Sequence, residues 1–294
     1  MPSNILQKAA GALAASPLLA RGRRLFAKNA SNWEMPLSRF EKLWAGSWLI
    51  LDDYSKGVFP PKFVDQQKAY QAEKDYRFSL PGMSAAEAAH NMITKPFWFG
   101  AAARKYLADF NFLTTSLERA GLKPPCKILE LGCGSGWMAE FLATMGFEVC
   151  GTTISKDDID DAWRRVKSLE AKGLSPALSF IASPMESVHT TIEPGSFEAV
   201  FVYEALHHAF DWHQAVHGSF RCLRSGGWLL LCNEPNVLHT FVSYRVAKLS
   251  NTHEIGFSKR ELLAELRQVG FRQVISIGPK LHWWSRPHWL LAQK

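Results

Sequence analysis

The hydrophobic pattern from residue 124 onward alternates between short apolar runs and longer amphipathic stretches. The apolar runs predict strands, and the last two of them lie near the C-terminus: 127–131, 147–151, 178–181, 197–203, 227–232, 271–277 and 287–293. The amphipathic stretches predict helices over 136–145, 156–171, 211–224 and 258–269. Strands that alternate with helices are typical of a mostly parallel α/β sheet with helices on both faces.

A different pattern precedes the sheet. Residues 84–121 are expected to be mostly helical, with an interruption near Lys95-Pro96. Sixteen of the 36 aromatic side chains lie between residues 31 and 112. One interpretation is a helical cap over 31–123 with an aromatic core, and another is a wall of an acceptor pocket. The two interpretations are compatible.

The first thirty residues form a basic arm. It holds five cationic side chains and no acidic one, and Pro17 is expected to break any single long helix. Three interpretations stay open: a disordered tail, an interfacial segment that docks on anionic lipid, and a targeting peptide. The net charge of the whole chain is +7, so the arm carries most of the excess.

Composition narrows the function classes. Hydrophobic residues make up 47% and charged residues 21%, which is ordinary for a globular protein. Five scattered cysteines without a CxxC pair argue against a disulfide scaffold and a cysteine zinc site. No run of eighteen apolar residues is present, and the body outside the arm is close to neutral, which disfavours nucleic acid as a partner. We expect a cytoplasmic protein.

The segment from Glu130 to Trp137 lies where the first predicted strand meets the first predicted helix. It reads Glu-Leu-Gly-Cys-Gly-Ser-Gly-Trp. Glycines let the backbone turn sharply and approach a ligand, and the amides at a helix start can hold an anionic group. The dinucleotide fingerprint G-x-G-x-x-G fails because Trp137 stands where it requires glycine. A nucleotide-binding oxidoreductase is therefore disfavoured.

This segment resembles the first motif of the class I S-adenosylmethionine-dependent methyltransferases, an acidic residue and any residue before Gly-x-Gly-x-Gly. Five further segments resemble later motifs of that family, in order: 196–200, 204–208, 221–227, the Glu-Pro pair at 234–235, and 266–274. The segment 204–208 contains the Leu-His-His seen in small-molecule methyltransferases. The resemblance covers residues 124–294 and implies a Rossmann-like, seven-stranded fold.

The resemblance also implies a cofactor, S-adenosyl-L-methionine, with S-adenosyl-L-homocysteine as the product. Its contacts are expected after the first four strands. The residues at those positions are Glu130, Gly132, Cys133, Gly134, Gly136, Trp137, Thr153, Ile154, Ser155, Asp158, Ser183, Pro184, Met185, Glu186 and Tyr203.

Two positions depart from the family pattern. Thr153 stands where the family usually has an acidic residue that holds both ribose hydroxyls, and a hydroxyl makes weaker bonds than a carboxylate. Ser183 begins the segment that usually carries an aspartate beside adenine. These departures lower the expected affinity. They also motivate an alternative function, a non-catalytic methyltransferase-like subunit that binds a partner through the N-terminal cap.

Methyl transfer requires alignment of the acceptor with the methyl group, and a hydroxyl acceptor also needs a base. His207 and His208 follow the fourth strand and are the leading candidates, with Glu204 as a further one. The competing interpretation is that these histidines only pack or shape the loop. His213 and His217 have the spacing of two metal ligands on a helix, but spacing implies no third, so no metal is expected.

Together these features predict a basic arm over 1–30, an aromatic helical cap over 31–123 and a methyltransferase domain over 124–294. The expected acceptor is a small molecule, a glycan or a lipid, and the histidine pair slightly favours O-methylation. Peripheral membrane contact through the arm is one of its open roles. The segment 282–289, rich in tryptophan, is expected to be a packed hairpin or a second wall of the acceptor pocket. The oligomeric state is left open.

Overall fold

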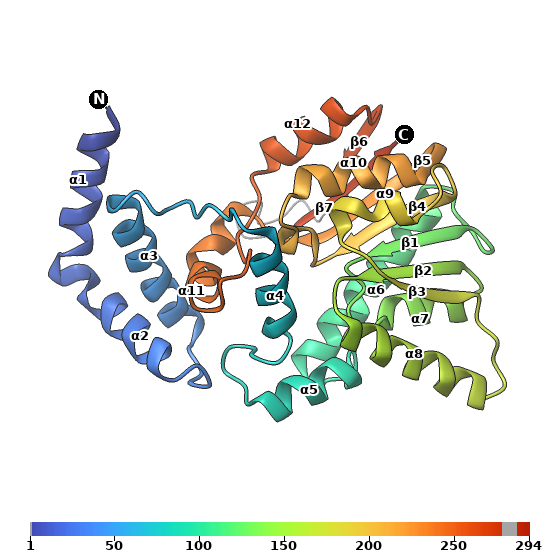
Figure 1. The fold of residues 1–294 in the computed structure, drawn as a ribbon, viewed down its shortest axis with the longest axis horizontal. Coiled ribbons are helices and arrows are strands. Elements are labelled where there is room, and N and C mark those ends of the chain that lie inside the picture. The colour runs from blue at the N-terminus through green and yellow to red at the C-terminus, as the bar shows by residue number, and fades with distance from the viewer. Residues whose placement is uncertain (1, 278–286) are drawn as a thin grey trace. The chain divides into compact units, whose positions relative to one another are not determined.

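The computed structural model describes residues 2–277 and 287–294 and divides into two compact units (Figure 1). The helical unit comprises residues 1–89 together with 237–256, and the sheet unit comprises 90–236 together with 257–294. This division differs from the boundary expected at 123/124, because the helical segment from 101 to 119 packs on the sheet. The separate role expected for 31–123 as a cap stays a prediction.

The sheet unit contains seven strands in the order β3-β2-β1-β4-β5-β7-β6. Neighbouring strands are parallel except around β7, which runs antiparallel to both β5 and β6. The predicted α/β sheet with its mostly parallel strands is therefore confirmed. The strands are β1 (Lys127–Leu131), β2 (Glu148–Thr153), β3 (Leu178–Ala182), β4 (Phe197–Tyr203), β5 (Leu223–Glu234), β6 (Gln273–Ser276) and β7 (His288–Gln293).

Helices cover both faces of this sheet. On one face lie α6 (Ala101–Arg119), α7 (Trp137–Thr144) and α8 (Lys156–Ala171). On the other lie α9 (Val188–Thr191), α10 (Trp212–Cys222) and α12 (Lys259–Val269). Two short 3-10 turns, η2 (Met185–Ser187) and η3 (Leu206–His208), follow β3 and β4.

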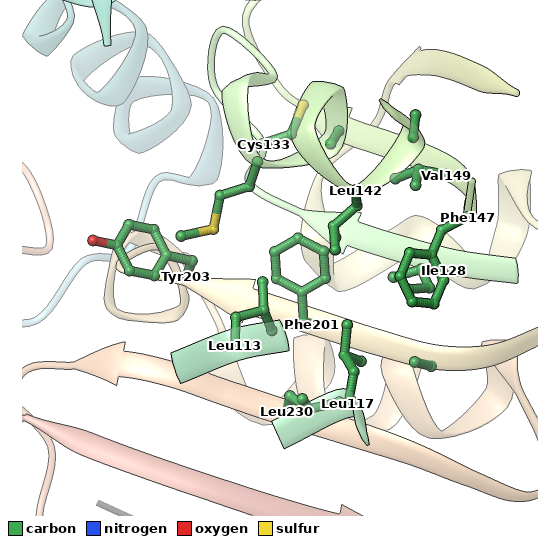
Figure 2. Close-up of a cluster of buried hydrophobic side chains, with 14 of the residues drawn as sticks. Leu113, Leu117, Ile128, Cys133, Leu142, Phe147, Val149, Phe201, Tyr203 and Leu230 are labelled. Atoms are coloured by element: carbon green, nitrogen blue, oxygen red, sulfur yellow. The ribbon is translucent and has the colours of Figure 1, made fainter. Parts of the chain in front are cut away.

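The alternation of strand side chains explains the two hydrophobic layers. Ile128 of β1 points to the layer that contains α6 and α7, whereas its neighbour Leu129 points to the layer that contains α10 and α12. In the first layer the ring of Phe201 lies among Leu113, Leu142 and other apolar side chains (Figure 2). Both faces of the central strands are buried, which is why their sequences are almost continuously apolar.

The helical unit has its own small core. Leu49 packs with Tyr244 and Ala247, and the hydroxyl of Tyr244 donates a hydrogen bond of 2.7 Å to Asp53. The helix that carries Tyr244 was not predicted from the sequence. The elements are α1 (Pro2–Ala14), η1 (Pro17–Leu19), α2 (Ala20–Ser31), α3 (Arg39–Ser55), α4 (Gln66–Tyr76), η4 (Val237–His239) and α11 (Thr240–Ser250), and α5 (Ala85–Thr94) spans the division between the units.

The basic arm is folded, which differs from the interpretation as a disordered tail. It forms α1 and α2, and both pack on α3. The break expected at Pro17 is present, because α1 ends at Ala14 and Pro17 begins a 3-10 turn. Within the described residues, no helix is both long and apolar enough to cross a bilayer.

The tryptophan-rich segment 282–289 lies largely outside the described residues, so neither interpretation of it is decided. Its last residue, Trp289, is described and is buried in the first hydrophobic layer. The ring of Trp289 makes an edge-on contact with Phe112 of α6, with 4.6 Å between the ring centroids.

Candidate functional site

The expected site residues follow the carboxyl ends of the central strands. The strand order reverses between β1 and β4, since β2 and β3 lie on one side of β1 and β5 lies beyond β4. In open α/β sheets, ligands bind beyond the carboxyl ends of the strands at such a reversal. The loops that meet there are those after β1, β4 and β5.

The glycine loop between β1 and α7 is tightly built. Gly132 has a φ of 68°, and a Cβ at this position would lie only 2.5 Å from the Cβ of Ala205 after β4. Gly134 has a φ of 50°, but its missing Cβ would meet nothing closer than Met92, at 3.9 Å. Gly132 therefore lets two loops approach each other, whereas Gly134 leaves space where a ligand can approach the backbone.

Glu130 is buried on β1, just before this loop, and is 3% exposed. Its Oε2 atom has no hydrogen-bond partner among the described residues. Burial raises the pKa of Glu130 to about 8, although the amide of Ala139 and the charge of Lys95 act in the opposite direction. A buried carboxyl oxygen without a partner is costly, which is typical of a group that awaits a ligand.

The side chains after β2 and β3 that are expected to contact the cofactor form hydrogen bonds with nearby groups of the protein in this structure. The hydroxyl of Thr153 accepts from the amide of Ser155, and Ser155 in turn caps α8 by accepting from the amide of Asp158. The hydroxyl of Ser183 lies 3.1 Å from that of Thr191, and Glu186 accepts from the amide of Asp211. These hydroxyls therefore hold the loops together in this structure.

The other expected cofactor residues differ in where their side chains lie. Trp137 is buried in an aromatic cluster with Tyr203 and Tyr106, so its ring belongs to the core. Met185 lies against the glycine loop, since its Cε would be 3.2 Å from a Cβ at Gly132. The remaining four expected residues are the buried Cys133 and Gly136 and the half-buried Ile154 and Pro184.

A segment before α6 is fastened next to the glycine loop, and sequence reasoning missed it. The hydroxyl of Ser135 donates to the carbonyl of Met92 at 2.8 Å. The guanidinium of Arg165 donates to the carbonyls of Ile93 and Lys95, at 2.8 and 2.6 Å, and pairs with Glu140 at 2.8 Å. We call residues 92–95 the strap. It is held by the glycine loop and by α8, whose Arg165 is in turn paired with Glu140 of α7.

The strap carries an ammonium group into the site. The Nζ atom of Lys95 lies 4.5 Å from the ring centroid of Tyr106 and 5.8 Å from that of Tyr203. Burial lowers the pKa of Lys95, although the charges of Glu204 and Glu130 oppose this shift. The two tyrosine rings therefore present their faces to a cation.

A network of charged and polar side chains connects the ends of β4 and β5 to α6. Lys105 pairs with Glu204 at 2.6 Å and with Asp109 at 3.2 Å. Asn233 donates to Glu204 at 2.6 Å, and Tyr203 donates to Asp109 at 2.7 Å. None of the residues Lys105, Asp109 and Asn233 belongs to a recognisable sequence motif. Their proximity to Tyr203 and Glu204 is therefore visible only in the folded chain.

The backbone at this network is strained. Glu204 has a φ of 47° and Asn233 has a φ of 59°, so both lie in the left-handed region although neither is glycine. Such conformations cost on the order of 1–3 kcal/mol each and cluster at functional sites. Burial would raise the pKa of Glu204, but the ammonium groups of Lys105 and Lys95 hold it below its ordinary value. Glu204 is therefore an ion-pair partner more than a base.

His207 is held by a buried carboxylate. Its Nδ1 atom lies 2.9 Å from Oε2 of Glu234, a residue that is 0% exposed. The same carboxylate accepts from the backbone amides of Ala205 and Leu206, each at 2.9 Å, and from that of His207 at 3.2 Å. A carboxylate that accepts from Nδ1–H selects the tautomer in which Nε2 carries the lone pair of the ring.

Three further histidines of this region, His208, His213 and His217, make other contacts. His208 is half-buried, and its ring centroid lies 4.2 Å from that of His207. His213 and His217 on α10 both approach Glu265 of α12, at 2.6 and 3.6 Å. The two histidines of α10 therefore connect this helix to α12.

The signal for Glu234 was present in the sequence, because a Glu-Pro pair follows the fifth strand as it often does in the family. What spacing could not reveal is that its carboxylate turns back to His207, 27 residues earlier. The contacts of Lys95 and Arg165 likewise depend on the packing of the strap against the glycine loop and α8.

Comparison with known proteins identifies the same region. Residues 129–231 match a family described as a methyltransferase domain. A ubiquinone biosynthesis O-methyltransferase of Bordetella bronchiseptica is 26% identical over 162 residues, which cover 52% of this chain and 65% of that protein. One of the same name from Alkalilimnicola ehrlichii is 34% identical over 104 residues, or 35% of this chain and 40% of that protein. The chain thus spans less than two thirds of these relatives.

Solved structures agree on the fold. The magnesium protoporphyrin IX methyltransferase of Synechocystis, crystallised with bound S-adenosylhomocysteine, superimposes with a TM-score of 0.56 at 16% identity, over 77% of this chain and 99% of that one. A sarcosine dimethylglycine methyltransferase-like protein of Galdieria sulphuraria gives a TM-score of 0.53 at 16% identity, over 68% and 91%. At this level of identity the likeness concerns the fold alone.

Proposed function

We propose that this chain, which contains a class I S-adenosylmethionine-dependent methyltransferase domain, transfers a methyl group to a hydroxyl oxygen of a small-molecule acceptor. The observation that carries the proposal is the buried Glu234, which orients His207 beside the end of β4. The names of two relatives, both O-methyltransferases of ubiquinone biosynthesis, support oxygen as the methylated atom. Glycan and lipid acceptors belong to the same proposal.

The residues after β1 fit S-adenosylmethionine. The partnerless oxygen of Glu130 suits the ammonium of its methionine part, and the open side of Gly134 lets the cofactor approach the backbone. The faces of Tyr106 and Tyr203 already hold a cation, the ammonium of Lys95, and such faces suit a sulfonium. The cofactor supplies an electrophilic methyl group on that sulfonium.

The residues after β4 and β5 supply the rest of the chemistry. His207 takes the proton of the acceptor hydroxyl at Nε2, while Glu234 holds the imidazole in the required tautomer and stabilises its charged form. Glu234 is thus a positioning residue. Glu204 accepts hydrogen bonds from Lys105 and Asn233 and so holds both side chains in place.

A second candidate is the non-catalytic methyltransferase-like subunit. It is favoured by the hydroxyls of Thr153 and Ser183, which bond within their own loops in this structure. If those hydroxyls never turn to a ligand, the adenosine part of the cofactor loses contacts that the family pattern provides.

Calorimetric titration of the full chain with S-adenosylmethionine and S-adenosylhomocysteine separates the two candidates. We expect saturable binding of both ligands. Absence of binding by folded protein, even with excess ligand, would reject the proposed function in favour of the non-catalytic subunit.

Methyl transfer is then tested with isotopically labelled cofactor and a set of small hydroxylated acceptors, starting with hydroxylated precursors of ubiquinone. The matched variant is His207→Gln, which we expect to bind the cofactor but to transfer the methyl group slowly. Equal transfer rates for His207→Gln and the natural chain would exclude His207 as the base.

A further inference from the structure

The two helices formed by the basic arm present unlike outer faces, and these faces have no part in methyl transfer. On α1, residues Ala10 and Ala14 are buried, and a Cβ at Gly11 would lie 3.3 Å from the Cβ of Ser55 on α3. The inner face of α1 is therefore defined by its packing on α3, beside which it runs in Figure 1.

The outer face of α1 is apolar. Ile5 is 74% exposed, Leu6 is 58% exposed and Leu13 is 45% exposed. Leu18, in the turn that joins α1 to α2, is 73% exposed. Four large aliphatic side chains thus project from neighbouring positions of a helix and the turn that follows it, which is typical of a surface that contacts another apolar phase.

The outer face of α2 is basic. Gly22 and Asn29 face inward, since a Cβ at Gly22 would lie only 2.3 Å from the carbonyl oxygen of Trp44 and Asn29 is 1% exposed. Arg21, Arg24 and Lys28 occupy the opposite side at helical spacing and are exposed.

Charge determines which kind of partner fits. The segment 1–33 contains five cationic side chains and no acidic one. Among these cations, Arg21 interacts electrostatically with a carboxylate outside the segment, that of Glu41 on α3. An apolar surface flanked by cations complements the interface of an anionic bilayer, where acyl chains lie directly beneath negative headgroups. A second copy of the chain would bring the same positive charge and be repelled.

We propose that α1 and α2 form a docking surface for an anionic lipid bilayer, with Ile5, Leu6, Leu13 and Leu18 entering the interface while Arg21, Arg24 and Lys28 contact the headgroups. This surface lies in the helical unit and is independent of the proposed methyl transfer. It selects the interfacial interpretation of the arm over the other two.

The test uses the full chain and flotation with vesicles. One set contains phosphatidylcholine alone, and the other contains phosphatidylcholine and phosphatidylglycerol in equal amounts. We expect recovery of the chain only with the anionic vesicles, and loss of binding at high salt because ions screen the headgroup charge. Equal recovery with both sets, or no recovery with either at low salt, would overturn the proposal.

Charge variants sharpen this test. The triple variant Arg21→Gln, Arg24→Gln, Lys28→Gln should bind anionic vesicles on the order of a hundredfold more weakly, at about fivefold for each cation. The matched control Lys123→Gln, Lys167→Gln, Lys172→Gln removes the same charge at exposed positions of the sheet unit and should bind almost normally. If the two triple variants weaken binding equally, net charge alone is responsible and the docking surface is rejected.

A double variant, Ile5→Gln with Leu13→Gln, tests the apolar contribution. It should weaken vesicle binding by roughly a hundredfold or more, at about tenfold or more for each aliphatic side chain that leaves the interface, while thermal unfolding stays close to that of the natural chain because both side chains are exposed. Light scattering of the natural chain and the same variants measures their oligomeric state and so tests the alternative partner, a second copy of the chain. A dimer that dissociates in the double variant, without vesicle binding by either protein, would assign the surface to self-association.

Discussion

At the carboxyl ends of β1, β2 and β3 the site is shaped by backbone turns and hydroxyl groups, whereas at the ends of β4 and β5 it is built from charged side chains. The first region contains the glycine loop and the hydroxyls of Thr153 and Ser183. The second contains the Lys105–Glu204 pair and the His207–Glu234 pair. Changes in the first region should therefore alter cofactor binding, and changes in the second should alter the rate of transfer.

The largest effect is expected at Gly134. The variant Gly134→Arg requires a side chain at a φ of 50° and fills the open side of the loop, so cofactor binding should disappear. The matched control is Gly173→Arg, at a φ of 82° in an exposed turn with nothing within 4 Å. Calorimetry and thermal unfolding of both variants separate loss of the site from loss of the fold. Retained binding in Gly134→Arg would mean that the cofactor does not approach this loop.

The next effect belongs to the second region. His207→Gln should lower kcat by roughly 10²–10⁴-fold, the usual contribution of a general base, without changing the Kd for S-adenosylmethionine. Glu234→Gln should lower kcat as well and alter the pH profile of kcat, because an amide cannot accept from all the donors that the carboxylate binds. If either of these variants changed the affinity for the cofactor but not kcat, the division of labour between the two regions would be wrong.

The buried carboxyl of Glu130 is the exception in the first region, and it predicts a pH dependence of stability. Between pH 4.5, its ordinary pKa, and about 8, the folded chain keeps a proton that the unfolded chain has released. The free energy of unfolding therefore decreases as pH rises through this window, by at most about 5 kcal/mol. In Glu130→Gln this contribution should vanish, while in the exposed control Glu170→Gln it should persist. Urea unfolding at pH 5 and pH 9 measures how much the free energy of unfolding changes between the two pH values. The same change in the natural chain and in both variants would contradict the assignment to Glu130.

The smallest effect concerns the strap. Arg165→Gln removes the partly buried partner of Glu140 and the donor to two strap carbonyls, so the free energy of unfolding should fall by about 3 kcal/mol and cofactor affinity should decrease. Its neighbour Arg164 pairs with Asp161, but its side chain is 70% exposed, so Arg164→Gln should cost less than about 1 kcal/mol. Equal losses in the two variants would show that the strap adds no stability.

Local patterns were sufficient for the sheet and for the first region of the site. The apolar runs predicted all seven strands to within a few residues. The signal is continuous in β1 and β4 because these central strands are buried on both faces. Glu130 to Gly136 was recognisable because a tight turn with positive φ angles demands glycine at particular positions.

The second region was only partly visible. His207 was named from its place after β4, but its partner Glu234 is on another strand and was not assigned to it. Lys105 and Asp109 come from α6, a helix that was expected to belong to the cap rather than to the sheet. Charged pairs between distant elements leave no periodic signal, since one ordinary side chain on each side is enough to form them.

The sequence by itself determined the α/β sheet, the glycine loop and the cationic arm. Each of these features depends on residues close together in the sequence, whose spacing follows the local geometry of a strand, a turn or a helix. Only the tertiary structure decided that the strap carries Lys95 to the tyrosines, that Glu234 orients His207, and that the arm is folded with four of its aliphatic side chains outward. These features depend on contacts between segments far apart in the chain, and such contacts exist only after the helices and strands have packed.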